Sequence, residues 1–148
     1  MIVATEANVV HALDAATGRP VWRAALGPPA PRAALPCGNI DPLGITGTPV
    51  IDPATGTLYL DALVVRQGEP RHLVYGLSIR DGTVLPGWPV DIAEGLHARG
   101  MAFNPRLQNE RGALLLLDGR LRPWPALACA AAAAAAAACP LDAYLKTG

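Results

Sequence analysis

The stretch that decides the fold is Val9-Val10-His11-Ala12-Leu13-Asp14-Ala15-Ala16-Thr17-Gly18-Arg19-Pro20-Val21-Trp22. Residues 9–13 are rich in β-favouring side chains and predict a strand. Residues 14–18 have turn chemistry, because Asp and Thr can bond nearby backbone amides and Gly18 can adopt a positive φ. The return strand covers 20–22, and Pro20, which lacks an N–H, places it at a sheet edge or makes it begin at Val21. The stretch therefore predicts a β-hairpin.

A weaker copy of this hairpin returns later in the chain. Aligning Leu13 with Leu77 gives a period of roughly 64 residues and places Ala12 on Gly76, Asp14 on Ser78, Gly18 on Gly82, and Trp22 within about two positions of Trp88. The period is longer than the roughly 40–45 residues of a compact four-stranded repeat. The difference is explained if long loops connect the repeats. A Trp beside a small residue suggests that each hairpin lays its indole on a neighbouring copy, which is typical of repeat proteins. We therefore expect both tryptophans to pack between repeats.

The pattern Ala12-x-Asp14-x-x-Thr17-Gly18-x-x-x-Trp22 resembles the tryptophan-docking repeat of the quinoprotein-dehydrogenase-like (PQQ-like) β-propellers. In that family the motif spans the third and fourth strands of a blade. The run from Pro36 to Asp52 resembles an inter-blade segment of bacterial members, in which Gly-Ile-x-x-Thr-Pro-Val-Ile-Asp opens a blade near the central axis. The resemblance implies either quinone-dependent dehydrogenases or cofactor-free scaffolds such as the outer-membrane assembly lipoprotein. Full-length proteins of this family are often periplasmic or extracellular.

The predicted fold is all-β, an incomplete β-propeller over residues 1–121. The expected strands are 2–4, 9–13, 20–22, 47–51, 57–65, 72–79, 83–91 and 111–117, with loops at 28–43 and 91–108, and they form blade pieces at about 1–27, 44–92 and 111–121. Propellers close with about 4–8 blades. Two to three blades cannot close a ring, so we expect the chain to need other blades or copies of itself as partners.

Residues 122–148 depart from the family pattern, which ends at about Arg120. Pro123 and Pro125 stand where a central strand should run. An unbroken alanine run from 130 to 138 predicts a low-complexity helix bounded by Pro125 and Pro140. The apolar stretch is shorter than the roughly 20 residues that span a bilayer. We interpret the tail as a frameshift or truncation product, with a genuine low-complexity linker as the alternative.

Composition narrows the function classes. The 12 basic residues balance the 12 acidic ones, so nothing favours nucleic acid or an acidic membrane as a partner. No signal peptide is visible at the N-terminus. Its residues look like the middle of a strand, as if the sequence began inside a blade. The three cysteines, Cys37, Cys129 and Cys139, do not form a closed disulfide framework. On one helix, Cys129 and Cys139 would lie about 15 Å apart, too far to bridge.

The family resemblance implies that a loop cysteine such as Cys37 can pair with one in a later blade. No position in this chain matches that partner convincingly. The simplest interpretation of Cys37 is therefore a free or orphaned thiol, and the disulfide state of the three cysteines stays open. The vicinal cysteine pair typical of the alcohol-dehydrogenase branch of the family is also absent from the sequence.

A quinone-dependent dehydrogenase needs a carboxylate base, a calcium ion and a clamp for the cofactor. The available carboxylates are Asp41, Asp52, Asp61 and Asp91, and all but Asp61 stand beside Pro, Gly or a strand end. Asp normally caps turns at such sites, so we expect turn capping. The histidines, His11, His72 and His97, have no partner at strand or helix spacing, which argues against a metal site. We expect His11 and His72 on the polar side of their strands.

The sequence therefore predicts a non-catalytic PQQ-like propeller segment, a scaffold or a ligand- or protein-binding module. It predicts no catalytic residue and no cofactor of its own, with PQQ and calcium possible only in a full-length parent. The alternative is a fragment of a quinone-dependent oxidoreductase acting on alcohols or sugars. A third hypothesis is a relic without activity. The residues expected to carry the repeat are Ala12, Asp14, Gly18, Trp22, Gly76, Gly82 and Trp88.

Overall fold

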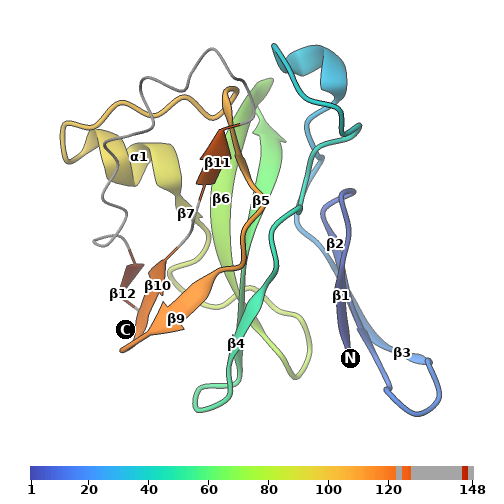
Figure 1. The fold of residues 1–148 in the computed structure, drawn as a ribbon. Coiled ribbons are helices and arrows are strands. Elements are labelled where there is room, and N and C mark those ends of the chain that lie inside the picture. Colours follow the sequence, from blue (N-terminus) through green and yellow to red (C-terminus); the bar gives the residue numbers. More distant parts are fainter. Residues whose placement is uncertain (123–124, 128–144, 147–148) are drawn as a thin grey trace.

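The computed structural model describes residues 1–122, 125–127 and 145–146 (Figure 1). The described residues are mostly β and form antiparallel sheets, none of which closes on itself. The prediction of a β-rich fold is confirmed. The sheets are ordered β1-β2-β3, β4-β5-β6-β7, β12-β10-β9 and β11-β8.

The first sheet is the predicted hairpin with one more strand beside it. It consists of β1 (Ile2–Ala4), β2 (Val9–Leu13) and β3 (Pro20–Ala25). Ala12 pairs with Trp22 across β2 and β3. Pro20 lies in the outer strand of this sheet, where its missing N–H removes no bond to a further strand. A 3-10 turn at Arg32–Ala34 interrupts the loop that follows.

The second sheet lies beside the first and contains the longest strands (Figure 1). Its strands are β4 (Val50–Asp52), β5 (Thr57–Arg66), β6 (Glu69–Ser78) and β7 (Val90–Asp91). The predicted inner strand at 47–51 begins later, because Pro49 has no N–H for the ladder. The predicted strand at 72–79 begins earlier, because residues 67–68 make a tight turn with φ values of 52° and 82° that extends β5 and β6.

The predicted outer strand at 83–91 is confirmed only over Val90–Asp91, and the rest of it is wrong. Only β7 and a single bridge between Leu77 and Val84 form on that side. Pro86 and Pro89 cannot donate to a ladder, and Gly87 has a φ of 84°, which turns the chain away from the extended path. The predicted loop at 91–108 is also incomplete, since it contains the helix α1 (Ile92–His97).

The third part of the chain is made of short strands. They are β8 (Gln108–Glu110), β9 (Leu115–Leu117), β10 (Arg120–Arg122), β11 (Pro125–Leu127) and β12 (Leu145–Lys146). The inner strand predicted at 111–117 is reduced to β9, which turns into β10 through Asp118 and Gly119, both with positive φ. The helix predicted from Pro125 is wrong over residues 125–127, which pair with β8 instead. The alanine run lies outside the described residues.

The core follows from the alternation of β5 and β6. One face of this pair packs on the first sheet, through apolar side chains that include Leu58, Leu60, Ala62, Val64, Leu73, Tyr75 and Leu77. The opposite face carries Tyr59 and Val74, which pack on Leu114 and Leu121 of the third part. Because both faces are covered, most residues of the pair are buried. Any polar side chain in these strands must therefore find a partner inside the protein.

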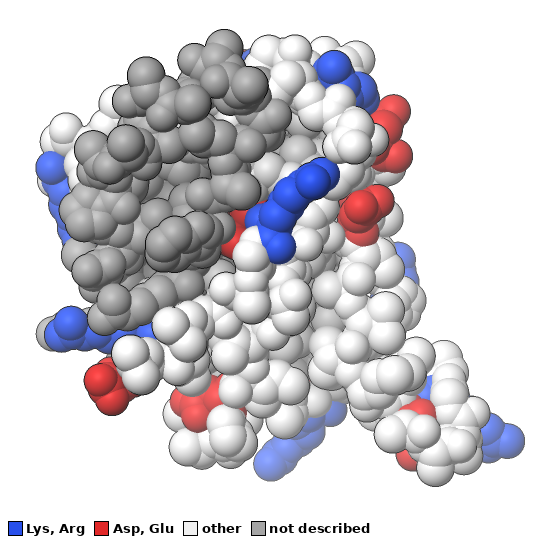
Figure 2. Space-filling view, viewed as in Figure 1, with Lys and Arg blue, Asp and Glu red and all other residues white. Residues whose placement is uncertain are grey.

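Charged side chains are dispersed on the visible face of the molecule (Figure 2). Lys and Arg alternate with Asp and Glu around its margin, and most of the described surface between them is uncharged. Among the described residues, no helix is both long and apolar enough to cross a membrane.

Candidate functional site

Trp22 joins the two large sheets. Its indole Nε1 donates a hydrogen bond of 2.9 Å to the carbonyl of Ile79, in the turn that follows β6. A Cβ built on Gly82 in the same turn would lie 2.6 Å from Cε3 of the indole, closer than real contacts allow. The indole therefore rests directly on Gly82. We call this contact, made by Trp22, Ile79 and Gly82, the docking contact.

The turn that receives the indole is built like the turn of the first hairpin. The amide of Gly18 donates to the carbonyl of Asp14, and the amide of Gly82 donates to the carbonyl of Ser78, both at 2.9 Å. The two glycines have φ values of 71° and 75°. Ser78 takes the place of Asp14, and its hydroxyl accepts from an amide two residues on, as the Asp carboxylate does. The substitution thus preserves the conformation that the docking contact requires.

Side chains add hydrogen bonds to both turns. The Asp14 carboxylate accepts from the Thr17 hydroxyl and amide at 2.7 Å each. These bonds favour the charged form and lower the pKa of Asp14 below its ordinary value. In the second turn, Thr83 donates to the Asp81 carboxylate in the same manner and lowers the pKa of Asp81. Both turns are thereby closed by side chains as well as by backbone.

Each tryptophan also covers a small residue of its own repeat. Trp22 stands opposite Ala12 in the ladder. Trp88 lies over Gly76, where an added Cβ would be 2.7 Å from its Nε1. Its ring is tilted against Tyr59, with the ring centroids 5.3 Å apart. The small residues at positions 12 and 76 thus leave room for an indole in both repeats.

A groove of about 610 Å³ runs between the first two sheets. Trp22 lines it on one side, and Leu58 lines it on the other. Four of the exposed large apolar side chains lie along it, and they are Met1, Val21, Ile51 and Ile79. The groove is therefore an apolar surface between the two sheets.

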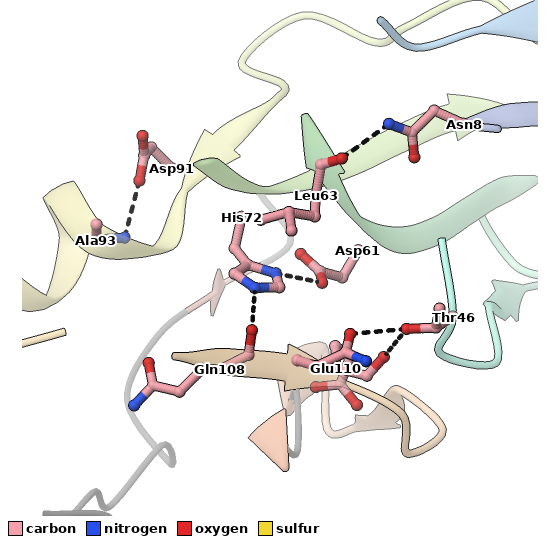
Figure 3. Close-up of polar contacts among 10 residues, drawn as sticks. Asn8, Thr46, Asp61, Leu63, His72, Asp91, Ala93, Gln108 and Glu110 are labelled. Atoms are coloured by element: carbon pink, nitrogen blue, oxygen red, sulfur yellow. Dashed lines mark hydrogen bonds and ion pairs between the residues drawn. The ribbon is translucent and has the colours of Figure 1, made fainter. Parts of the chain in front are cut away.

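A buried polar cluster lies on the other side of the second sheet (Figure 3). His72 is 2% exposed and Asp61 is 5% exposed. Their strands are paired so that Leu63 stands opposite His72 and Asp61 opposite Val74, which makes the two polar residues diagonal neighbours on one face. Nδ1 of His72 lies 2.9 Å from Oδ2 of Asp61. This is the buried pair on which the rest of the cluster is assembled.

The cluster extends from the second sheet to β8. Nε2 of His72 lies 3.0 Å from the carbonyl oxygen of Gln108, and the ring edge of Phe103 lies against the imidazole at a centroid distance of 6.0 Å. The Thr46 hydroxyl donates to the carbonyl of Glu110 at 2.6 Å and lies 2.8 Å from the side-chain oxygen Oδ1 of Asn109. Figure 3 shows the hydrogen bonds of His72 and Thr46 reaching β8. The segment is thus tied to the sheet by side chains and not by a shared ladder.

The charge of His72 follows from these surroundings. Burial is the largest influence and lowers its pKa, because the charged form loses water. The negative charge of Asp61, its hydrogen bond, the Gln108 carbonyl and the charge of Glu110 act in the opposite direction. Together they outweigh burial, so the pKa of His72 lies above its ordinary value of 6.5.

The structure corrects several expectations for single residues. His72 is buried and not on a polar face, because the third part of the chain covers that side of the sheet. Its partner is Asp61 on the neighbouring strand, which the sequence spacing did not show. Cys37 is in a disulfide bond and is not a free thiol. Disulfide pairing depends on the separation of Cα atoms in the fold, which sequence spacing does not give.

The capping expectation is confirmed for two carboxylates. Asp52 accepts from the Ala54 amide at 2.9 Å, and Asp91 is the N-cap of α1. Asp41 accepts from the backbone amide of Arg32 across a loop. Within the described part of the chain, no three His, Cys, Asp or Glu residues gather as a metal site would require.

Two further buried contacts were missed by sequence reasoning. The Asn8 side chain, at a φ of 58°, donates to the Leu63 carbonyl at 2.9 Å. The Tyr75 hydroxyl donates to the Leu26 carbonyl at 2.8 Å, and burial raises the pKa of Tyr75. Both contacts link the first and second sheets, as the docking contact does. The only signal for the Tyr75 contact was a polar hydroxyl in an otherwise apolar strand, and Asn8 stands in a polar turn that gives no such signal.

Comparison with known proteins adds no relative: no protein-family model, no curated protein and no solved structure matches this chain.

Proposed function

We propose that this chain is a non-catalytic segment of a PQQ-like β-propeller that serves as a scaffold or binding module. In this proposal the β1–β3 sheet and the β4–β7 sheet are pieces of successive blades. The observation that carries it is the docking contact, in which Trp22 of one repeat bonds to Ile79 and rests on Gly82 of the next. The turns of both repeats have the same hydrogen bonds, which supports their equivalence.

The engagement of the carboxylates favours a scaffold over a dehydrogenase. Asp52 and Asp91 satisfy backbone amides, and Asp61 is paired with His72 inside the protein. A calcium site takes six or more oxygen ligands, several of them carboxylates. Recruiting these residues would require breaking a turn, a helix cap or the buried pair. A structural role explains all three carboxylates without such a change.

The outer face of the first sheet supports assembly with further blades. Val3 is exposed there, on the side of the sheet opposite to Trp22 and Ala24, which pack on the second sheet. Gly18 has open space where a Cβ would lie, whereas the equivalent Gly82 is covered by an indole. Because a propeller needs about 4–8 blades, we propose that a second copy of this chain packs on this face.

Sedimentation equilibrium of the purified chain tests the assembly. We expect association that rises with protein concentration and is weakened in Val3→Asp, which places a charge on the outer face. Val84→Asp, a matched change at another exposed valine, should leave association unchanged. A single monomeric species with a cooperative melt at all concentrations would refute the assembly.

A titration with PQQ in the presence and absence of calcium separates the two function classes. A scaffold should give no saturable binding that depends on calcium, and no dye-linked oxidation of alcohols or sugars. Saturable binding that calcium strengthens would overturn the scaffold assignment and favour the oxidoreductase fragment. Asp61→Asn and Asp52→Asn would then show which carboxylate takes part.

A further inference from the structure

The hydrogen-bond partners of His72 set the number of protons in the buried pair. Nδ1 faces a carboxylate oxygen of Asp61, and Nε2 faces the carbonyl oxygen of Gln108. A carbonyl only accepts hydrogen bonds, and so does an ionised carboxylate, while a neutral imidazole has a single N–H. A neutral His72 beside an ionised Asp61 can satisfy only one of the two contacts. Both contacts therefore require one additional proton on the pair.

The charges around the pair favour the imidazole as the site of that proton. The charged groups that face His72 are Asp61 from β5 and Glu110 from β8, both negative. The described segment before β8 contributes Phe103, which is uncharged. Arg71, next to His72 on β6, lies in an ion pair with Asp91 at 3.0 Å. Among the described residues, the negative charges of Asp61 and Glu110 thus stabilise an imidazolium at this position.

The pair joins parts of the protein that share no ladder. Asp61 and His72 belong to the second sheet, while β8 pairs with β11 in a different sheet. The contact from Nε2 to Gln108 holds β8 against the second sheet, and the Thr46 hydroxyl, in the segment before β4, bonds to the Glu110 carbonyl. The flanking residues Arg106 and Gly112 make their own bonds, to Glu69 and Thr48. Loss of the proton would leave either the Gln108 carbonyl or the Asp61 carboxylate without its bond.

We propose that His72 and Asp61 form a pH-sensitive latch, which in its protonated form holds β8 on the second sheet and on losing its proton releases β8.

The direction of the pH dependence follows from linkage. The pKa of His72 is raised in the folded protein above the ordinary value of about 6.5 that it has when unfolded. A group of this kind contributes its full stabilisation below the unfolded pKa, and the contribution is lost as pH rises through the folded pKa. The latch is therefore closed in mildly acidic solution and opens as the solution becomes alkaline.

The test is a pH series of NMR spectra of the full chain labelled with ¹⁵N. The chain has three histidines, so His11→Gln and His97→Gln assign the His72 signals by elimination. We expect both ring nitrogens of His72 to carry protons at pH 6. The backbone amide signals of Gln108 to Glu110 should shift with the same midpoint as the His72 ring. His11 and His97 in the same sample are internal controls, because the β8 amide signals should not follow the signals of their rings.

Two results would overturn the latch. The first is that the His72 ring keeps the same protonation state across the pH series and the β8 amide signals do not shift. The second is a His72 titration that leaves the β8 amides unmoved. Asp61→Asn supplies an independent check, because removing the negative charge should shift the His72 midpoint to lower pH and shift the β8 transition with it. A variant in which only one of the two midpoints moves would contradict the coupling.

Discussion

Replacing Gly82 by Ala tests whether the docking contact stabilises the fold. Gly82 and Gly18 occupy equivalent turns with φ values of 75° and 71°. An L side chain in this left-handed conformation costs about 1–2 kcal/mol in either turn. Only at Gly82 does the new Cβ meet the indole of Trp22, at 2.6 Å, while Gly18 has nothing within 4 Å. Gly18→Ala is therefore a control with the same backbone strain and no displaced indole.

The excess cost at Gly82 has two sources. The indole must move, which costs about 1–3 kcal/mol for overpacking, and its hydrogen bond to Ile79 is weakened or lost, which costs about 0.5–1.5 kcal/mol. We expect Gly82→Ala to lower the free energy of unfolding by about 2–3 kcal/mol more than Gly18→Ala. Urea denaturation followed by far-UV circular dichroism, at a concentration where the chain is monomeric, measures both values.

A double-mutant cycle assigns the excess to the indole. In a Trp22→Ala background the two glycine substitutions should have nearly equal effects, because no ring lies over Gly82. If Gly82→Ala and Gly18→Ala differ by less than about 0.5 kcal/mol in the unsubstituted chain, the docking contact contributes no stability and the reasoning fails. An excess that persists without the indole would assign the cost to the turn itself.

Three further substitutions test the contacts around the two sheets. Tyr75→Phe removes a buried hydroxyl and leaves a buried carbonyl without its donor, so it should lower the free energy of unfolding by about 1–3 kcal/mol in urea. Asn8→Ala should cost more than Gln67→Ala, because both residues have a positive φ but only Asn8 bonds across the sheets; equal losses would contradict this. Thr17→Val should raise the pKa of Asp14 towards 3.8, as seen in its carboxyl ¹³C titration, so that the turn loses its stabilisation at a higher pH on acidification.

The local parts of the fold were predictable from the sequence. The hairpin at β2 and β3 and the turn after β6 depend on residues close in the chain, such as Asp14 and Gly18, whose preferences act over a few positions. The prolines of the segment that follows Val84 were visible too, yet the segment was predicted as one strand. There the missing N–H groups at Pro86 and Pro89 interrupt the ladder.

The buried cluster was not predictable in the same way. Asp61 and His72 stand in different strands, and nothing in their spacing shows that Leu63 pairs with His72. Gln108 is 36 residues further along the chain and supplies a backbone carbonyl, which leaves no mark in the sequence. The one available signal was that a charged and a titratable residue occur in strands otherwise apolar on both faces. Such residues indicate a partner but do not identify it.

The energetics of the buried pair favour a role in placement over one in stability. Moving two charges out of water costs several kcal/mol per ion, which their attraction repays only with good geometry and full hydrogen bonding. At His72 both ring nitrogens have oxygen partners, so the geometry is specific to one position of β8. An apolar pair could fill the same space and would hold β8 without fixing its register. The pair therefore fixes where β8 lies against the second sheet, and it does so only while the extra proton is bound.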